Sequence, residues 1–197
     1  VVGVVGLGYV GLPLARAFHQ AGFRVMGFDI DERKIVALKE GKNYLKHLGA
    51  DFVQDMARSG RFEPTANMGR LGEADAVILA VPTPLGPHLE PDMSYVMNTT
   101  HDVARTLRPG QLVVLESTTY PRTTRDDMLP VLEKTGLKHG KDFFLAFSPE
   151  REDPGRKDFD TQTIPKLVGG IDKEAGQIAF ELYKHAIKSV VLVSSAE

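Results

Sequence analysis

Three glycines near the start of the chain have the spacing needed to hold a diphosphate. Gly6, Gly8 and Gly11 directly follow a run of valines, in the segment Gly6-Leu7-Gly8-Tyr9-Val10-Gly11. We expect Gly6 to make a tight turn, Gly8 to let a diphosphate approach the backbone, and Gly11 to let the next helix lie close to the sheet. The diphosphate would then face unpaired backbone N–H groups and the positive end of the helix dipole. This segment therefore predicts a dinucleotide-binding site.

An acidic residue follows at the distance that such a site requires. Asp29 ends a second apolar strand and lies about 20 residues beyond the glycines, where a carboxylate can accept hydrogen bonds from the adenosine ribose. Its negative charge would repel a 2′-phosphate, which favours NAD over NADP. Arg33 and Lys34 come just after it and have two interpretations. Either they lie over the adenine or the ribose, or they are ordinary surface of the next helix.

The elements that must position these residues alternate between strand and helix. Strands are predicted at residues 1–5, 24–28, 60–65, 74–81, 112–115, 143–147, 166–168 and 190–193, with Gly169 and Gly170 ending the seventh. Helices are predicted at residues 12–21, 31–40, 47–59, 93–107, 123–136 and 173–185. This alternation is typical of an α/β fold, here a Rossmann-like doubly wound parallel sheet with helices on both faces. We expect the strand order 3-2-1-4-5-6, with further strands near Lys166 and Val190.

Polar loops follow three of the predicted strands. Val81-Pro82-Thr83-Pro84 follows the fourth strand, Glu116-Ser117-Thr118-Thr119-Tyr120-Pro121 the fifth, and a charged segment at 148–155 the sixth. Ligands of open α/β sheets bind outside the carboxyl ends of the strands, so these loops are predicted to face the same crevice as the glycine turn. Two alternatives remain open: the first loop is a rigid connector, and the third is solvated surface.

The composition bounds the class of protein. The 197 residues are 42% hydrophobic, enough for one substantial core, and a net charge of -2 gives no basic patch for nucleic acid or an anionic membrane. No segment approaches the roughly 20 apolar residues of a membrane span. Without cysteine the chain has no disulfide, no thiolate metal site and no thiol nucleophile. We expect a cytoplasmic protein, no metal and, because the chain starts inside a strand, a fragment of a longer protein.

Five segments in order resemble the UDP-glucose/GDP-mannose dehydrogenase family, over essentially the whole chain. They are the glycine turn, the three loops, and Ile164-Pro165-Lys166-Leu167-Val168-Gly169-Gly170. Tyr120 and the run Glu150-Arg151-Glu152-Asp153-Pro154-Gly155 are most similar to the branch of UDP-N-acetylglucosamine 6-dehydrogenases. The resemblance implies oxidation of a UDP-sugar C6 alcohol to a carboxylate in two steps, in polysaccharide biosynthesis. It also implies that two NAD are used and that a cysteine traps the aldehyde.

The resemblance implies roles for particular residues as well. Thr118 matches the hydroxyl that holds a catalytic water or the nascent oxyanion, and Glu150 matches the glutamate that orders this water and moves protons. Thr83 would lie near the nicotinamide. The cofactor-binding residues expected in all are Gly6, Gly8, Tyr9, Val10, Gly11, Asp29, Arg33, Lys34, Val81, Pro82, Thr83, Ser117 and Thr118.

Other features depart from the family or lie outside this chain. Arg122 stands where the family usually has glycine, and Arg156 stands where it commonly has asparagine. The family's cysteine, lysine, asparagine and aspartate would lie beyond Glu197, with the central helix and the UDP-sugar-binding domain. We therefore expect residues 1–197 to form only the NAD-binding domain, monomeric and inactive, of an enzyme that dimerises through its central helix.

Two other functions remain open. A stand-alone nucleotide-binding module without chemistry would explain the missing cysteine. A β-hydroxyacid dehydrogenase shares the glycine turn, but it does not predict the segment at 148–155.

Overall fold

An eight-stranded sheet forms the centre of the protein. The computed structural model describes residues 1–45, 48–86, 90–150 and 165–197. The strands lie in the order β3-β2-β1-β4-β5-β6-β7-β8, which confirms the order predicted for the first six. Their bounds are β1 Val2–Val5, β2 Val25–Phe28, β3 Phe62–Thr65, β4 Ala76–Leu79, β5 Gln111–Leu115, β6 Phe143–Phe147, β7 Lys166–Gly170 and β8 Val190–Leu192.

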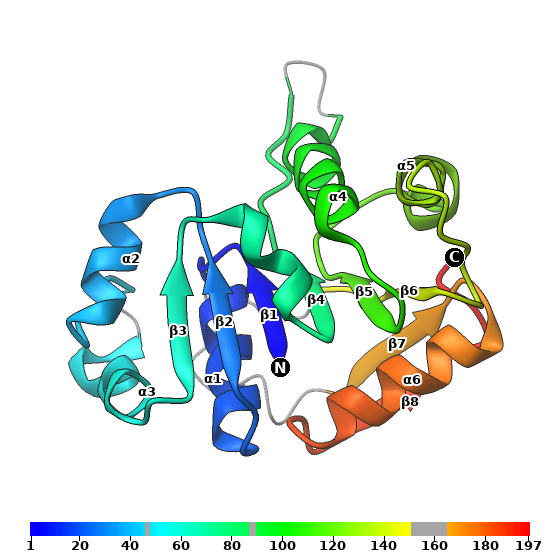
Figure 1. The fold of residues 1–197 in the computed structure, drawn as a ribbon. Helices are drawn as coiled ribbons and strands as arrows, with labels where there is room; N and C mark the ends of the chain where they lie inside the picture. The colour runs from blue at the N-terminus through cyan, green and yellow to red at the C-terminus, as the bar shows by residue number, and fades with distance from the viewer. Residues whose placement is uncertain (46–47, 87–89, 151–164) are drawn as a thin grey trace.

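Helices cover both faces of the sheet, as predicted (Figure 1). Their bounds are α1 Gly11–Gln20, α2 Glu32–Lys39, α3 Gln54–Arg58, α4 Ser94–Thr106, α5 Leu129–Glu133 and α6 Lys173–Lys184. Successive side chains of a strand point to opposite faces. Val4 accordingly belongs to a core cluster with α1, α2, α3 and α6, and Val5 to a second cluster with α4 and α5. The two layers of helices leave the carboxyl ends of the parallel strands available for a site.

The predicted parallel sheet is confirmed for β1 to β6, and the direction of β7 differs. β1 to β6 pair in parallel, but β7 pairs antiparallel to β6 through Gly169 and Gly170. These glycines belong to β7 and do not end it, contrary to the prediction. A Cβ at Gly169 would lie 2.1 Å from the carbonyl oxygen of Ser195, and a Cβ at Gly170 would lie 2.1 Å from the backbone nitrogen of Gly176. Close backbone approach, and not a turn, therefore explains both glycines.

The helix predicted at 47–59 is shorter than expected. Residues 46–47 lie outside the described residues, and Gly49 has a φ of 78°. A residue with positive φ cannot continue a right-handed helix, so the helical segment that leads into α3 begins only after Gly49. A short 3₁₀ helix at Ala50–Val53 comes first, and α3 follows it directly.

The helix predicted at 123–136 is divided in two. A π-helical segment, Thr123–Met128, comes before α5. Pro130 stands at the start of α5, and its nitrogen cannot donate to the helix ladder, so the hydrogen-bond pattern changes there.

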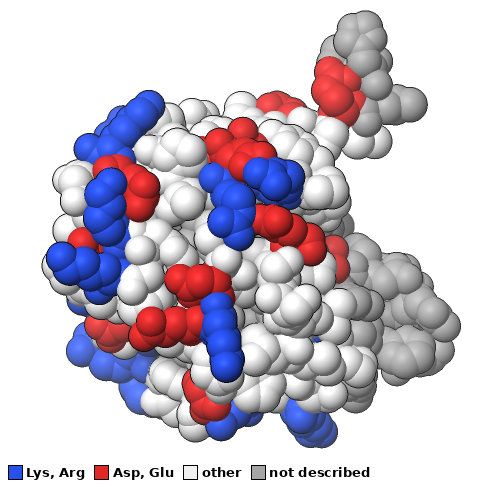
Figure 2. Space-filling model, turned by 90° about the vertical axis from the view of Figure 1, so that its right-hand side faces the viewer, with Lys and Arg blue, Asp and Glu red and all other residues white. Residues whose placement is uncertain are grey.

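Charged side chains of both signs are interspersed on the face shown in Figure 2. Surface ion pairs include Arg122 with Asp126 and Arg70 with Glu73. The described residues of this face therefore form no extended patch of one sign. In the described part of the chain, no helix combines the length and the apolar character needed to cross a membrane. The same residues contain no group of histidine and acidic side chains that could hold a metal ion.

His19, near the end of α1, is expected to make the stability of the fold depend on pH. It is 5% exposed, and its Nε2 lies 2.7 Å from the hydroxyl oxygen of Ser59. Burial, and then the charge of Arg61, lowers the pKa of His19 below the ordinary histidine value of 6.5. The unfolded chain therefore binds more protons than the folded chain just below that pH. The free energy of unfolding should fall as the pH drops through this range.

Urea unfolding of the wild type and of His19→Gln, at about pH 7.5 and about pH 5.5, measures this effect. The wild type should lose more stability between the two conditions than His19→Gln, because the variant has no group that titrates at this position. His101 is exposed on α4, and His101→Gln is the matched control, which should keep the pH dependence of the wild type. An unchanged pH dependence in His19→Gln would contradict the expectation.

Candidate functional site

The glycine turn forms between β1 and α1, as its spacing predicts. Gly6 has a φ of 91°, and a Cβ there would lie 2.4 Å from the carbonyl oxygen of Ala80, just after β4. A Cβ at Gly11 would lie 1.8 Å from the carbonyl oxygen of Gly6, so α1 starts with its backbone against the turn. A Cβ at Gly8 would meet no atom within 4 Å. The space for a ligand is therefore beside Gly8, while Gly6 and Gly11 serve the packing of the turn.

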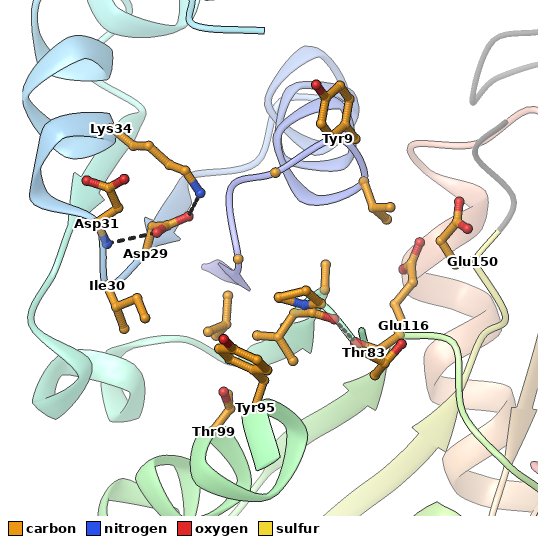
Figure 3. A pocket seen from close by; sticks show the side chains of 18 of the residues that line it. Tyr9, Asp29, Ile30, Asp31, Lys34, Thr83, Tyr95, Thr99, Glu116 and Glu150 are labelled. Carbon is orange, nitrogen blue, oxygen red and sulfur yellow. Dashed lines mark hydrogen bonds and ion pairs between the residues drawn. The ribbon is translucent and has the colours of Figure 1, made fainter. Parts of the chain in front are cut away.

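A cavity of about 780 Å³ lies next to Gly8, within the size range of small-molecule sites. It is bordered by residues at the carboxyl ends of five strands and by one face of α4 (Figure 3). The predicted site residues that line it are Gly6, Gly8, Tyr9, Val10, Asp29, Lys34, Val81, Pro82, Thr83, Ser117, Thr118 and Glu150. Gly11 and Arg33 are not among its lining residues. The fold therefore brings the glycine turn and the three predicted loops to one cavity.

Asp29 lies at one end of this cavity, and three donors hold its carboxylate. Oδ2 accepts from the backbone N–H of Leu7 at 2.9 Å and from Nζ of Lys34 at 2.7 Å, and Oδ1 accepts from the backbone N–H of Asp31 at 2.9 Å. A carboxylate offers about four acceptor positions, so one remains for a ligand hydroxyl. The ion pair with Lys34 also neutralises part of the charge. Repulsion of a 2′-phosphate is therefore weaker than Asp29 alone predicts.

Arg33 and Lys34, for which the sequence left two interpretations open, differ in the structure. Lys34 lines the cavity and pairs with Asp29. The side chain of Arg33 is 91% exposed and donates two hydrogen bonds to Asp31. These bonds lower the pKa of Asp31 to about 2. Arg33 is thus placed on the surface of α2, whereas Lys34 stands beside the expected position of the ribose.

Tyr44 is a cavity residue that the sequence did not indicate. It lies between α2 and α3, and its hydroxyl donates to the carbonyl oxygen of Leu7 in the glycine turn at 2.6 Å. Burial, and then the charges of Asp29 and Asp31, raise the pKa of this hydroxyl well above its usual range, so it stays protonated and able to donate. The bond joins residues 37 positions apart, which is why no local sequence pattern marks it.

Loops after β4, β5 and β6 form the other end of the cavity. Ser117 is buried, and its hydroxyl donates to the carbonyl oxygen of Val81 at 2.6 Å, so it joins two of these loops. Thr118 is exposed and lines the cavity together with Thr83 and Glu150. Of the predicted charged run that starts at Glu150, residues 151–155 lie outside the described residues. This end therefore presents two threonines and a glutamate, which come from the loops after three different strands.

Glu116 also lines the cavity, although the sequence gave it no role. It is 2% exposed, and its two carboxylate oxygens accept hydrogen bonds from Lys166 on β7 and from Tyr183 on α6. Lys166 is 4% exposed and Tyr183 is 0% exposed, so the three side chains form a buried group, here called the Glu116 cluster. Burial, and then the charge of Glu116, raise the pKa of Tyr183 well above its usual range. The hydroxyl of Tyr183 is therefore a lasting donor to Glu116.

One face of α4 completes the wall. The residues of this helix that line the cavity are Tyr95, Asn98, Thr99 and Asp102. Their spacing places them on one helical face, and this periodicity could have grouped them from the sequence. Periodicity could not show that the face borders the cavity, because that depends on how α4 packs on the sheet.

Comparison with known proteins identifies the family. A family model for the UDP-glucose/GDP-mannose dehydrogenase family, NAD binding domain, matches residues 1–187. The chain belongs to this family. The matched region is the NAD-binding domain, so the cofactor of this dehydrogenase-family chain is NAD. Membership also removes the β-hydroxyacid dehydrogenase alternative.

Individual members of the UDP-glucose/GDP-mannose dehydrogenase family resemble the chain closely. Protein CapL of Staphylococcus aureus is 38% identical over 196 residues, which are 99% of this chain and 45% of the relative. The UDP-N-acetyl-D-glucosamine 6-dehydrogenase of Pseudomonas aeruginosa is 36% identical over 187 residues, 94% of this chain and 43% of the relative. The solved UDP-N-acetyl-D-mannosamine dehydrogenase of Pyrococcus horikoshii has a TM-score of 0.91 at 33% identity, covering 99% of this chain and 47% of that one. The chain thus spans about half the length of these relatives.

Arg122 takes a backbone conformation that favours glycine, the residue that the resemblance led us to expect at this position. Its φ is 74°, and among the described residues it is the non-glycine residue with a positive φ. An L-residue in this region carries a strain of about 1–2 kcal/mol. The guanidinium of Arg122 donates to both oxygens of Asp126, at 2.7 and 2.9 Å. This ion pair offsets part of the strain, so the turn is kept without glycine.

Proposed function

We propose that this chain is the NAD-binding half of a nucleotide-sugar 6-dehydrogenase, which oxidises the C6 alcohol of a UDP-N-acetylhexosamine to a carboxylate. The family match over residues 1–187 is the observation that carries the proposal. Relatives named as dehydrogenases of UDP-N-acetyl-D-glucosamine and UDP-N-acetyl-D-mannosamine support the substrate class. NAD would supply the hydride acceptor for each of the two oxidation steps, with water as the source of the second carboxylate oxygen.

The residues around the cavity fit NAD. A diphosphate would lie against Gly8, where a Cβ would meet no protein atom within 4 Å. The remaining acceptor position of Asp29 would receive a hydroxyl of the adenosine ribose. The nicotinamide would then lie at the opposite end, near Thr83 and Thr118. Figure 3 shows Thr83 on the far side of the glycine turn from Asp29.

Thr118 and Glu150 are proposed to act on the reacting groups at that end. Both line the cavity, and they reach it from the loops after β5 and β6. The hydroxyl of Thr118 can donate to a developing oxyanion, and the carboxylate of Glu150 can accept a proton from water. The chain contains no cysteine. The thiol that traps the aldehyde, and most of the UDP-sugar site, would therefore come from a part of the protein outside these 197 residues.

Calorimetric titration of NAD into the chain tests this proposal. We expect a Kd between about 1 μM and about 1 mM. We also expect no NADH to form when UDP-N-acetylglucosamine is added, because most of the UDP-sugar site would lie outside these 197 residues. Absence of binding at millimolar NAD would contradict the proposal, as would turnover by this chain. Size-exclusion chromatography should show a monomer, since we propose that a homodimer forms only in the full-length protein.

A stand-alone nucleotide-binding module is the second candidate. The absence of cysteine from the chain favours it. The gene sequence downstream of Glu197 distinguishes the two candidates. A continuing reading frame with a cysteine-containing domain supports the enzyme, and a stop codon supports the module.

A further inference from the structure

The two ends of the cavity differ in where the cation lies that pairs with the carboxylate. At the adenosine end, Asp29 pairs with Lys34, and both line the cavity. At the other end, Glu116 lines the cavity and pairs with Lys166, which is not among the lining residues. Figure 3 shows Glu116 on the side away from Asp29 and Lys34. A ligand group at this end would therefore lie nearer to the carboxylate of the pair than to its ammonium group.

The Glu116 cluster holds the carboxylate of Glu116 in a fixed place. Lys166 and Tyr183 each donate to one oxygen of Glu116, and neither of them is among the residues that line the cavity. The carboxylate therefore stands between the cavity and the ammonium group of Lys166. The backbone N–H of Glu116 also donates to the carbonyl oxygen of Leu79 at 2.7 Å. Anchored at both backbone and side chain, the carboxylate cannot turn away from the cavity.

A fixed carboxylate distinguishes the two redox forms of a nicotinamide. The oxidised ring carries a positive charge, and the reduced ring is neutral. In a partly buried site with low effective dielectric constant, a full negative charge a few ångströms away changes the affinity for a cation by about one to two orders of magnitude. Lys166, on the far side of the carboxylate, weakens this attraction. About one order of magnitude therefore remains.

We propose that Glu116 makes the site prefer oxidised NAD over NADH by about tenfold. The inference rests on the proposed function, because that function places the nicotinamide at this end of the cavity. A preference of this sign favours binding of the oxidised cofactor and release of the reduced one. An enzyme that oxidises its substrate twice needs this exchange in every turnover.

Titration of the wild-type chain with NAD, NADH and ADP-ribose tests the proposal without any variant. ADP-ribose keeps the diphosphate and both riboses but has no nicotinamide. We expect NAD to bind about tenfold more tightly than NADH, and ADP-ribose measures the affinity that does not depend on the nicotinamide. Equal or tighter binding of NADH would overturn the inference. If none of the three ligands binds, the proposed function fails, which is a different result from equal binding of all three.

The double variant Glu116→Gln/Lys166→Met then removes both charges of the buried ion pair, so no buried charge is left unpaired. Its glutamine keeps an oxygen that can accept from Tyr183. Its affinity for NAD should fall about tenfold and its affinity for NADH should stay unchanged, so the preference disappears. Tyr183→Phe is the matched control, because it alters the same cluster but keeps the carboxylate charged, and its preference should stay within about twofold of the wild type. An equal loss of affinity for both ligands in the double variant would show a merely structural role and overturn the inference.

Discussion

Replacing Gly8 with valine is expected to abolish NAD binding while the fold stays intact. A Cβ at Gly8 would meet no protein atom within 4 Å, and Gly8 is not among the residues with positive φ. Valine should therefore change the free energy of unfolding by less than about 0.5 kcal/mol. The branched side chain would instead occupy the space where the diphosphate is proposed to lie, at the start of α1. The loss of two hydrogen bonds between backbone N–H groups and the charged diphosphate weakens NAD binding by at least about 100-fold.

Calorimetry and urea unfolding, the latter followed by circular dichroism, measure the two effects of Gly8→Val separately. Gly11→Ala is the contrasting variant, since its Cβ would lie 1.8 Å from the carbonyl oxygen of Gly6. The turn must shift to admit this methyl group, and we expect a loss of about 1–3 kcal/mol of stability. An NAD affinity of Gly8→Val within about threefold of the wild type would show that the diphosphate lies elsewhere. The proposed function would then lose its physical basis.

Replacing Lys166 with methionine is expected to destabilise the fold by about 3–5 kcal/mol, the largest stability effect that we predict. Lys166 and Glu116 are 4% and 2% exposed, and Lys166 donates to one carboxylate oxygen of Glu116. Methionine has a similar length but cannot pair with the carboxylate. The variant therefore leaves a buried charge without its partner, and the desolvation cost of that charge is no longer compensated.

The double variant Glu116→Gln/Lys166→Met distinguishes this cause from lost packing. Neutral side chains in both positions remove the uncompensated charge, so most of the stability should return. Residue 166 is methionine in both variants, so a change in packing at this position cannot explain the recovery. Lys173→Met is the control, because Lys173 is exposed at the start of α6 and should change stability by less than about 0.5 kcal/mol. The chain has no tryptophan, so circular dichroism is the suitable probe. A loss below about 1 kcal/mol in Lys166→Met would contradict the expectation.

The stability of the Glu116 cluster and the ligand preference proposed for it arise from one arrangement. β5 ends just before Glu116, β7 supplies Lys166, and α6 supplies Tyr183. The cluster therefore joins the carboxyl end of β5, which borders the cavity, to the last part of the chain. Because β7 runs antiparallel to β6, its first residue, Lys166, reaches the carboxyl edge of β5. If β7 ran parallel to β6, that residue would lie at the opposite edge of the sheet.

Local sequence determined the elements and one half of the site. Valine runs and glycine spacing are short-range properties, so the glycine turn, the strand carrying Asp29 and the order of the first six strands could be predicted. The rule that ligands bind at the carboxyl ends of parallel strands also predicted that Thr83 and Thr118 face the same cavity as the glycine turn. These predictions succeed because each depends on residues adjacent in the chain or on a general rule of the fold.

Only the tertiary structure decided which distant side chains meet. Tyr44 reaches Leu7 over 37 positions, and Glu116 meets Lys166 and Tyr183 over 50 and 67 positions. Packing also decided that Lys34, and not its neighbour Arg33, faces the cavity. Such contacts depend on how helices and loops pack against the sheet, and the spacing of residues along the chain does not determine that packing.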